Sequence, residues 1–164
     1  LATLDGDCML VRETTHRFSP LSFHRAMIRQ RMPILFTAAG RAYLAYCSDE
    51  ERRQILQLLV AGNDEQASFV RNRVLVGQML DKVRRQGYAT NEGEWNLQTK
   101  VAALALPVRH KEHVLATINI VFLKKAISID EAAESLLPHL RAAVEKIERC
   151  LNTSEDLIVK AGLR

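Results

Sequence analysis

The sequence has few of the residues that crosslink small domains or bind metal ions. Three cysteines occur among 164 residues, and Cys8, Cys47 and Cys150 are widely spaced without a CxxC pair. This distribution predicts buried or partly buried thiols in a reducing cytoplasm, in place of disulfides or a zinc site. His110 and His113 form an HxxH motif without a third ligand nearby, so we expect neither a metal ion nor a cofactor.

Long hydrophobic runs and catalytic motifs are also missing. No apolar stretch approaches the roughly 20 residues that a membrane-spanning helix needs, and the first ten residues do not resemble a signal peptide. The chain begins inside a strand-like pattern, so we expect a fragment of a longer protein. Neither a phosphate-binding glycine loop nor a GxSxG nucleophile motif occurs. These absences argue against an enzyme, although an enzyme acting on a small acid stays open as an alternative.

The charge balance is mildly basic. A net charge of +4 arises from 23 Lys and Arg residues against 19 Asp and Glu residues, and the two signs are interleaved along the chain. The densest basic cluster, formed by Arg25, Arg29 and Arg31, has few aromatic neighbours that would stack on bases. We therefore interpret these charges as solvated surface and do not expect this segment to bind nucleic acid directly.

The first third of the chain combines strand and helix signals. Residues 1–13 predict two short strands around the Asp5-Gly6 turn, and residues 18–24 predict an edge strand because they contain a proline. Thr37 is a suitable N-cap for a helix over residues 38–47. Ser48 and Glu51 form a capping-box pattern before a second helix, which is expected to end at Gly62 and to bury Ile55, Leu58 and Leu59.

The remaining chain predicts helix, loop, strands and helix in that order. A helix over residues 72–86 ends before Gly87 and would bury Val76, Met79, Leu80 and Val83, and a polar loop follows. Residues 101–108 and 113–123 predict two covered strands, and a second capping box at Ser128 opens a helix that Pro138 should kink or divide. The whole predicts one α+β domain over residues 1–164, with a mostly antiparallel sheet and helices packed on it.

The segment TAAG, residues 37–40, suggests a binding site for a small anion. Small side chains at the start of a helix let a carboxylate approach free backbone N–H groups at the positive end of the helix dipole. Close packing of the helix on the sheet explains the same small residues equally well, and the sequence does not decide between the two.

Four blocks together resemble the effector-binding domain of IclR-type transcriptional regulators. They are MPILFTAAGRAYLAYCSDEER (32–52), VRRQGYATNEGE (83–94), ALALPVR (103–109) and VLATINIV (114–121). The resemblance implies a GAF- or profilin-like domain with a central antiparallel sheet. It also implies a homodimer or homotetramer that contacts promoter DNA through an N-terminal winged helix-turn-helix absent from this chain. The stretch RETTHRFSPLSFHRAM (12–27), with GYATNEGEW and NLQTK, is similar to the MhpR-type activators of 3-(3-hydroxyphenyl)propionate catabolism within that family.

The resemblance also implies an effector pocket between the sheet and its flanking loops. The implied lining residues are Leu21, His24, Met32, Ala38, Ala39, either Asn91 or Glu94, Ala103, Asn119 and Val121. Family members that bind small oxoacids carry a hydroxyl or thiol at the last three positions, whereas this chain has larger or more apolar residues there. The loop after Gly87 is about two residues longer than in many relatives, which leaves Asn91 and Glu94 as alternatives.

These residue types suit an aromatic acid. Leu21, Phe23, Met32 and Val121 would cover a ring, and the N–H groups near Ala38 and Ala39 would bind the carboxylate. His24 or Asn119 would hydrogen-bond a phenolic hydroxyl. Trp95 is either a lid or a loop anchor, and Arg12, His16 and Arg17 have no assigned role.

We therefore expect a cytoplasmic ligand-sensing domain of a transcriptional activator, with a small aromatic carboxylic acid as effector and no membrane contact. The alternatives are an IclR-type repressor domain that senses a different small carboxylic acid, a pure oligomerisation module, and the enzyme named above.

Overall fold

One antiparallel sheet forms the centre of the molecule. The computed structural model describes residues 1–15 and 27–160, and the side chains of these residues up to position 153. Within them the sheet has six strands in the order β3-β2-β1-β6-β5-β4, and every neighbouring pair is antiparallel. The strands are β1 (Ala2–Asp5), β2 (Cys8–Val11), β3 (Arg31–Pro33), β4 (Ala89–Asn91), β5 (Val101–His110) and β6 (His113–Leu123).

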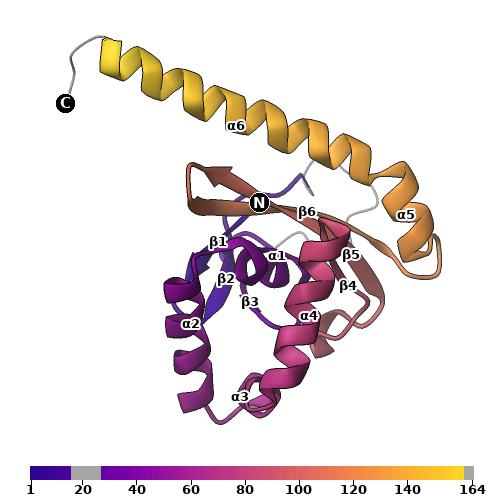
Figure 1. Ribbon diagram of the computed structural model, residues 1–164. Helices are drawn as coiled ribbons and strands as arrows, with labels where there is room; N and C mark the ends of the chain where they lie inside the picture. The colour runs from indigo at the N-terminus through magenta and orange to yellow at the C-terminus, as the bar shows by residue number, and fades with distance from the viewer. Residues whose placement is uncertain (16–26, 161–164) are drawn as a thin grey trace.

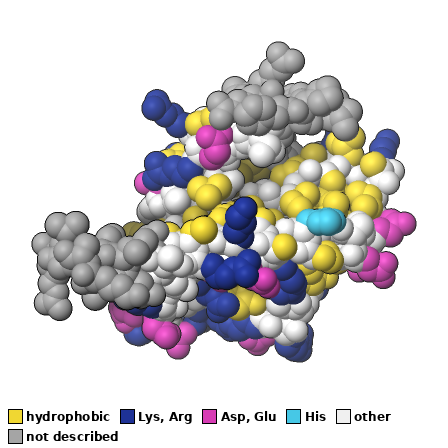
Figure 2. Space-filling view, turned by 90° about the horizontal axis from the view of Figure 1, so that it is seen from above, with side chains coloured by type: hydrophobic (Ala, Val, Ile, Leu, Met, Phe, Trp, Pro, Cys, Tyr) yellow, Lys and Arg dark blue, Asp and Glu magenta, His cyan; other side chains and the backbone are white. Residues whose placement is uncertain are grey.

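Helices cover both faces of this sheet (Figure 1). One side holds α1 (Ala38–Tyr46), α2 (Asp49–Ala61), α3 (Glu65–Val70) and α4 (Arg73–Gln86), and α1 packs directly on β5 and β6. The other side holds α5 (Ile129–Ser135) and α6 (Leu137–Lys160). Figure 2, seen from above, shows hydrophobic side chains gathered at the surface on the α6 side. The architecture is the predicted α+β sheet with helices packed on it.

The two long central strands separate two hydrophobic clusters. Ala103 and Ala105 of β5 pack in the cluster that contains α1, whereas Leu104 and Leu106 pack in the cluster that contains α6. Because successive side chains of a strand point to opposite faces, a strand covered on both faces must be apolar throughout. This explains why residues 101–108 form an unbroken apolar run in the sequence.

Both hairpins lie where they are predicted. Asp5 pairs with Cys8, so Gly6 and Asp7 form the two-residue turn, and Gly6 takes a φ of 64° that favours glycine. β5 and β6 pair from Val101 and Leu123 to His110 and His113, with one irregularity after Val108. The predicted strand over residues 18–24 lies outside the described residues.

Side-chain caps fix the helix starts. Thr37, Ser48 and Asn72 each accept a backbone N–H from three residues further along, and the complete capping box forms at Ser128 with Glu131. The predicted box at Ser48 is only half made, because Glu51 accepts the Tyr43 hydroxyl at 2.5 Å. Burial and this carboxylate raise the pKa of Tyr43 above its usual range.

Several predicted details are wrong at the level of single residues. Leu58 is 56% exposed, because α2 turns Ile55 and Leu59 into the core, with Leu56 packed beside them, and leaves Leu58 outside this contact. Strand β4 and helix α3 were not predicted. They have three and six residues respectively, which are too few to show a hydrophobic period.

The predicted effect of Pro138 is confirmed. The C-terminal helix is divided there, because α5 ends at Ser135 and α6 begins at Leu137.

The cysteines follow the prediction at two positions. Cys8 and Cys47 are buried, but Cys150 is exposed on α6. Burial raises the pKa of the Cys47 thiol to about 11, with a further contribution from the Glu51 carboxylate. A thiol that stays protonated at neutral pH is a weak nucleophile, so Cys47 fits a core residue.

The first turn of α1 packs directly on the backbone that precedes it. A Cβ atom at Gly40 would lie 2.0 Å from the Ile34 carbonyl oxygen and 2.5 Å from the Ile34 Cα. Backbone atoms at that distance cannot give way as a flexible side chain would. The small residues of TAAG are therefore required by close packing at position 40, one of the two explanations that the sequence left open.

The surroundings of two helical glycines predict opposite effects of replacing each of them by alanine. Gly40→Ala should destabilise the fold by about 1–3 kcal/mol, because the added methyl forces α1 away from Ile34. Gly77→Ala in α4 should stabilise it by about 0.5–1 kcal/mol, since nothing lies within 4 Å of a Cβ there. Urea unfolding of both variants measures the difference, and equal effects would contradict the packing argument.

Candidate functional site

Four of the predicted site residues share one face of the sheet. Asn91 pairs with Ala103, and Ala103 pairs with Val121, so these three form a row across β4, β5 and β6. Asn119 lies in the next row, opposite Ala105. Directly opposed residues project to the same side, and Ala103 and Ala105 belong to the cluster packed around α1. The structure therefore brings Asn91, Ala103, Asn119 and Val121 together on the α1 side.

The other described residues of the prediction surround this row at different depths. Ala38 and Ala39 form the first turn of α1 and are each 2% exposed. Met32 is buried on β3, three strand positions from β6, or about 14 Å along the sheet. This places it in the core and away from Val121. Leu21, Phe23 and His24 lie outside the described residues, as do His16 and Arg17.

A polar network joins the start of α1 to the end of β4. Arg41 donates from Nε to the Leu35 carbonyl at 2.9 Å, and from Nη1 to the Thr90 carbonyl at 2.8 Å. The same Nη1 atom donates to Glu94 Oε1 at 2.9 Å, which makes an ion pair. The Arg41 side chain is only 12% exposed, so its charge requires these acceptors in place of water.

Asn91 and Glu94 belong to this same network. Asn91 Nδ2 donates to the Phe36 carbonyl and to Glu94 Oε2, each at 2.6 Å. The Glu92 N–H donates to the same oxygen at 2.5 Å. Asn91 is buried, whereas the Glu94 side chain is 42% exposed. The two alternatives that the sequence left open are therefore direct hydrogen-bond partners beside the first turn of α1.

The electrostatics of the network favour an ionised Glu94. Partial burial alone would raise the pKa of this carboxyl, but the Arg41 charge and the hydrogen bonds from Glu92 and Arg41 outweigh it, and the pKa is lowered. Arg41 was not among the site residues predicted from the sequence. Its signal was available, because Arg41 is the only charged residue in the helix AAGRAYLAY and a buried cation needs an acceptor.

Backbone donors are also available at the start of α1. Gly40 N donates to Thr37 Oγ1 at 3.2 Å, and Arg41 N donates to the Thr37 carbonyl at 3.0 Å. The N–H groups of Ala38 and Ala39 have no partner among the described residues. Buried backbone donors are nearly always paired, so these two are suited to a ligand oxygen.

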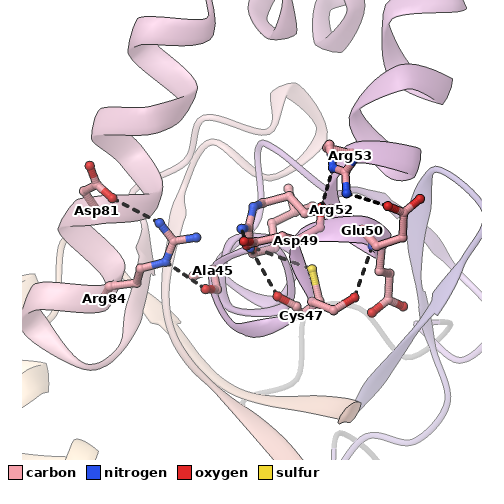
Figure 3. A network of polar contacts seen from close by, with 11 residues as sticks. Ala45, Cys47, Asp49, Glu50, Arg52, Arg53, Asp81 and Arg84 are labelled. Atoms are coloured by element: carbon pink, nitrogen blue, oxygen red, sulfur yellow. Dashed lines mark hydrogen bonds and ion pairs between the residues drawn. The ribbon is translucent and has the colours of Figure 1, made fainter. Parts of the chain in front are cut away.

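Arginine side chains hold the opposite end of α1. Arg52 Nη1 donates to the Leu44 and Cys47 carbonyls at 3.2 and 3.1 Å, and Arg84 Nε donates to the Ala45 carbonyl at 3.0 Å (Figure 3). Cations at the C-terminal end of a helix complement its dipole. α1 is thus fixed at both ends, which keeps the donors at its start in a constant position relative to the sheet.

Apolar surface lies on the same side of the sheet as these donors. Val121 is 44% exposed although it faces the α1 side of the sheet. Trp95 is partly buried and packs against the cluster around α1, a contact that either a lid or a loop anchor would make. Arg12 donates to Thr3 Oγ1 at 2.7 Å on an exposed part of the hairpin. The candidate site therefore combines polar donors at the α1 start with an open apolar strand position.

Other surface features lie elsewhere. One depression of about 560 Å³ is lined by Ala126, Ile127, Glu131, Glu134 and Ser135, and a second of about 270 Å³ adjoins α6. Neither includes a predicted site residue. Within the described ranges, no three His, Cys, Asp or Glu side chains are placed to hold a metal ion. No helix of the described chain is long and apolar enough to cross a membrane.

Comparison with known proteins points to one family. The bacterial transcriptional regulator IclR C-terminal family matches residues 1–149. The Pca operon regulatory protein of Acinetobacter baylyi is 24% identical over 140 residues, which cover 85% of this chain and 48% of that protein. The chain thus spans about half the length of this curated relative.

Solved structures share the fold. A candidate transcriptional regulator from Rhodococcus sp. RHA1 superposes with a TM-score of 0.71 at 22% identity, covering 93% of this chain and 61% of that one. The inducer-binding domain of a PobR double mutant from Acinetobacter, in complex with 3-hydroxybenzoic acid, superposes with a TM-score of 0.66 at 20% identity, covering 90% and 84%. At these identities the superpositions establish the fold.

The lowered Glu94 pKa predicts a pH-dependent contribution to stability. A carboxyl whose pKa falls on folding stabilises the fold above its ordinary value of 4.5, and this contribution is lost as the pH drops through the lowered pKa. Urea unfolding of wild type and Glu94→Gln should therefore differ most at neutral pH and converge in acid. Glu92→Gln, a neighbouring exposed carboxylate, is the control. A difference that grows on acidification would contradict the assigned network.

Proposed function

The chain belongs to the C-terminal domain family of IclR-type bacterial transcriptional regulators, and on this basis we propose that it senses an aromatic carboxylic acid. The observation that carries the proposal is the pairing of features at the start of α1. The N–H groups of Ala38 and Ala39, which have no partner in the described part of the chain, lie beside an ion-pair network. Val121 presents apolar surface on the same side of the sheet. An aromatic acid carries the complementary carboxylate and ring.

The apolar residues in the row across β4, β5 and β6 favour an aromatic effector over a short oxoacid. Ala103 and Val121 offer no hydrogen bond, so a small polar ligand would leave its oxygens unpaired against them. A ring would instead bury apolar area, at roughly 25 cal/mol per Å². The PobR domain is a structural neighbour solved with a hydroxylated aromatic acid, which agrees in ligand class.

We propose 3-(3-hydroxyphenyl)propionate as the effector and MhpR-type activation as the role of the whole regulator. The assignment of this particular effector and role rests on the resemblance of the stretch RETTHRFSPLSFHRAM to MhpR-type activators. Asn119, opposite Ala105, is the described residue that would bind the phenolic hydroxyl. Repression relieved by a different small carboxylic acid is the competing role.

The proposed mechanism is a shift between arrangements of subunits. The effector binds one arrangement more tightly, and this difference in affinity moves the population of DNA-binding heads that the complete regulator would carry. DNA contact, homodimer or homotetramer formation and a cytoplasmic location are parts of the same proposal.

Titration calorimetry with 3-(3-hydroxyphenyl)propionate tests the proposal. Val121→Glu should weaken binding at least about tenfold, because it places a like charge near the effector carboxylate and removes apolar contact. Leu115→Glu is the matched control: Leu115 is 45% exposed, against 44% for Val121, on the same strand about 20 Å away. It should leave the affinity unchanged.

The outcomes test separately the specific effector, the class of ligand and the position of the site. Heat from 3-hydroxybenzoate but not from 3-(3-hydroxyphenyl)propionate would remove the finer assignment and keep the ligand class. Heat from pyruvate alone would replace the aromatic class by short oxoacids. Equal losses in Val121→Glu and Leu115→Glu would place the site elsewhere.

A further inference from the structure

The candidate site already contains a carboxylate, and it belongs to the protein. Glu94 accepts hydrogen bonds from Arg41 Nη1 at 2.9 Å, from Asn91 Nδ2 at 2.6 Å and from the Glu92 N–H at 2.5 Å. Three donors converging on one carboxylate constitute an anion-binding site. We propose that Arg41 and Asn91 join the Ala38 and Ala39 N–H groups in binding the effector carboxylate, and that Glu94 occupies the Arg41 and Asn91 donors until the effector displaces it. This inference rests on the proposed function.

Arg41 and Asn91 are fixed in place, as a binding site requires. Arg41 is held by the Leu35 and Thr90 carbonyls, and Asn91 is held by the Phe36 carbonyl. All three acceptors are backbone atoms of the segments that flank the start of α1 and the sheet edge. The donors therefore keep their geometry when Glu94 leaves, and a ligand meets a preorganised site.

Glu94 itself is the exchangeable member. Its side chain is 42% exposed, against 12% for Arg41, so water can solvate the carboxylate when it moves outward. It takes a single terminal nitrogen of the guanidinium, and Arg41 Nη2 has no hydrogen-bond partner among the described residues. A ligand carboxylate that used both terminal nitrogens would make the bidentate contact that Glu94 does not make.

Two carboxylates cannot share these donors without repulsion. Like charges a few ångströms apart at a partly buried site disfavour each other strongly. Binding of an anionic effector must therefore move Glu94 out or protonate it, and its lowered pKa opposes protonation. A neutral ligand of the same shape does not compete with Glu94 for the cation.

The displacement would be visible at the neighbouring residue. Trp95 follows Glu94 directly and packs against the cluster around α1, and it is the single tryptophan of the chain. Movement of Glu94 changes the surroundings of this indole. Intrinsic fluorescence thus reports on the loop, independently of the heat of binding.

The experiment compares wild type, Glu94→Gln and Glu94→Ala with two ligands, 3-(3-hydroxyphenyl)propionate and its neutral primary amide. Removal of the competing charge should tighten acid binding about tenfold or more in both variants and leave amide binding within about twofold. Glu92→Gln, the control, removes an equal charge from the same loop and keeps the backbone N–H, which is the group that Glu92 contributes to the network. It should bind both ligands as wild type does. The acid should change Trp95 fluorescence in wild type more than the amide does.

The results distinguish failure of the Glu94 displacement from failure of the proposed sensing function. Acid binding to wild type with no gain in either Glu94 variant overturns the displacement and leaves the sensing function in place. An equal gain for acid and amide, or an equal gain in Glu92→Gln, shows a general charge or loop effect and also overturns it. If neither 3-(3-hydroxyphenyl)propionate nor 3-hydroxybenzoate binds wild type or Glu94→Gln, the proposed function falls together with the displacement.

Discussion

The direct packing of the first turn of α1 on the backbone of residue 34 is the constraint on which the rest of the site depends. Gly40 leaves no room for even a methyl group against the Ile34 carbonyl. This approach brings the carbonyls of Leu35 and Phe36 within reach of Arg41 and Asn91. One close contact therefore positions the helix start, the buried cation and the loop after β4 in the same place.

Burial of a single guanidinium explains much of the local structure. Arg41 can lie 12% exposed because two backbone carbonyls and one carboxylate replace its water. These acceptors come from two distant parts of the chain, residue 35 and residues 90–94, so satisfying the charge also ties those parts together. The arginines at the other end of α1 act in the same way on the carbonyls of Leu44, Ala45 and Cys47. Arg109 adds a link between the layers: its side chain lies 5.5 Å from the Tyr46 ring, and its N–H donates to Glu148 of α6.

Much of the architecture was predictable because it depends on local chemistry. The Asp5-Gly6 turn, the caps at Thr37, Ser48, Asn72 and Ser128, and the break at Pro138 each follow from a residue whose backbone preference is strong. The exposure of Leu58 was not predictable, since periodicity shows that a helix has an apolar face but not how wide its contact is. Strand β4 was missed because its pairing with β5 is a property of the folded sheet and not of three residues.

The candidate site was predictable only as a set of neighbouring residues. The resemblance indicated Asn91, Glu94, Ala103, Asn119 and Val121, and the register places four of these residues on one side of the sheet. It gave no reason to choose between Asn91 and Glu94, because their mutual hydrogen bond depends on the path of the loop. Arg41 was missed because its partners lie six and about fifty residues away. Whether Leu21, Phe23 and His24 join them stays a prediction.

Arg41 also has a consequence for the sheet as a whole. β4 is an edge strand, and an edge strand with unpaired carbonyls can recruit a strand of another chain and start aggregation. The Arg41 side chain takes the Thr90 carbonyl in the middle of β4. A residue on a helix thereby occupies one carbonyl of this edge strand, so the charge that orders the candidate site also leaves the strand with one acceptor fewer for another chain.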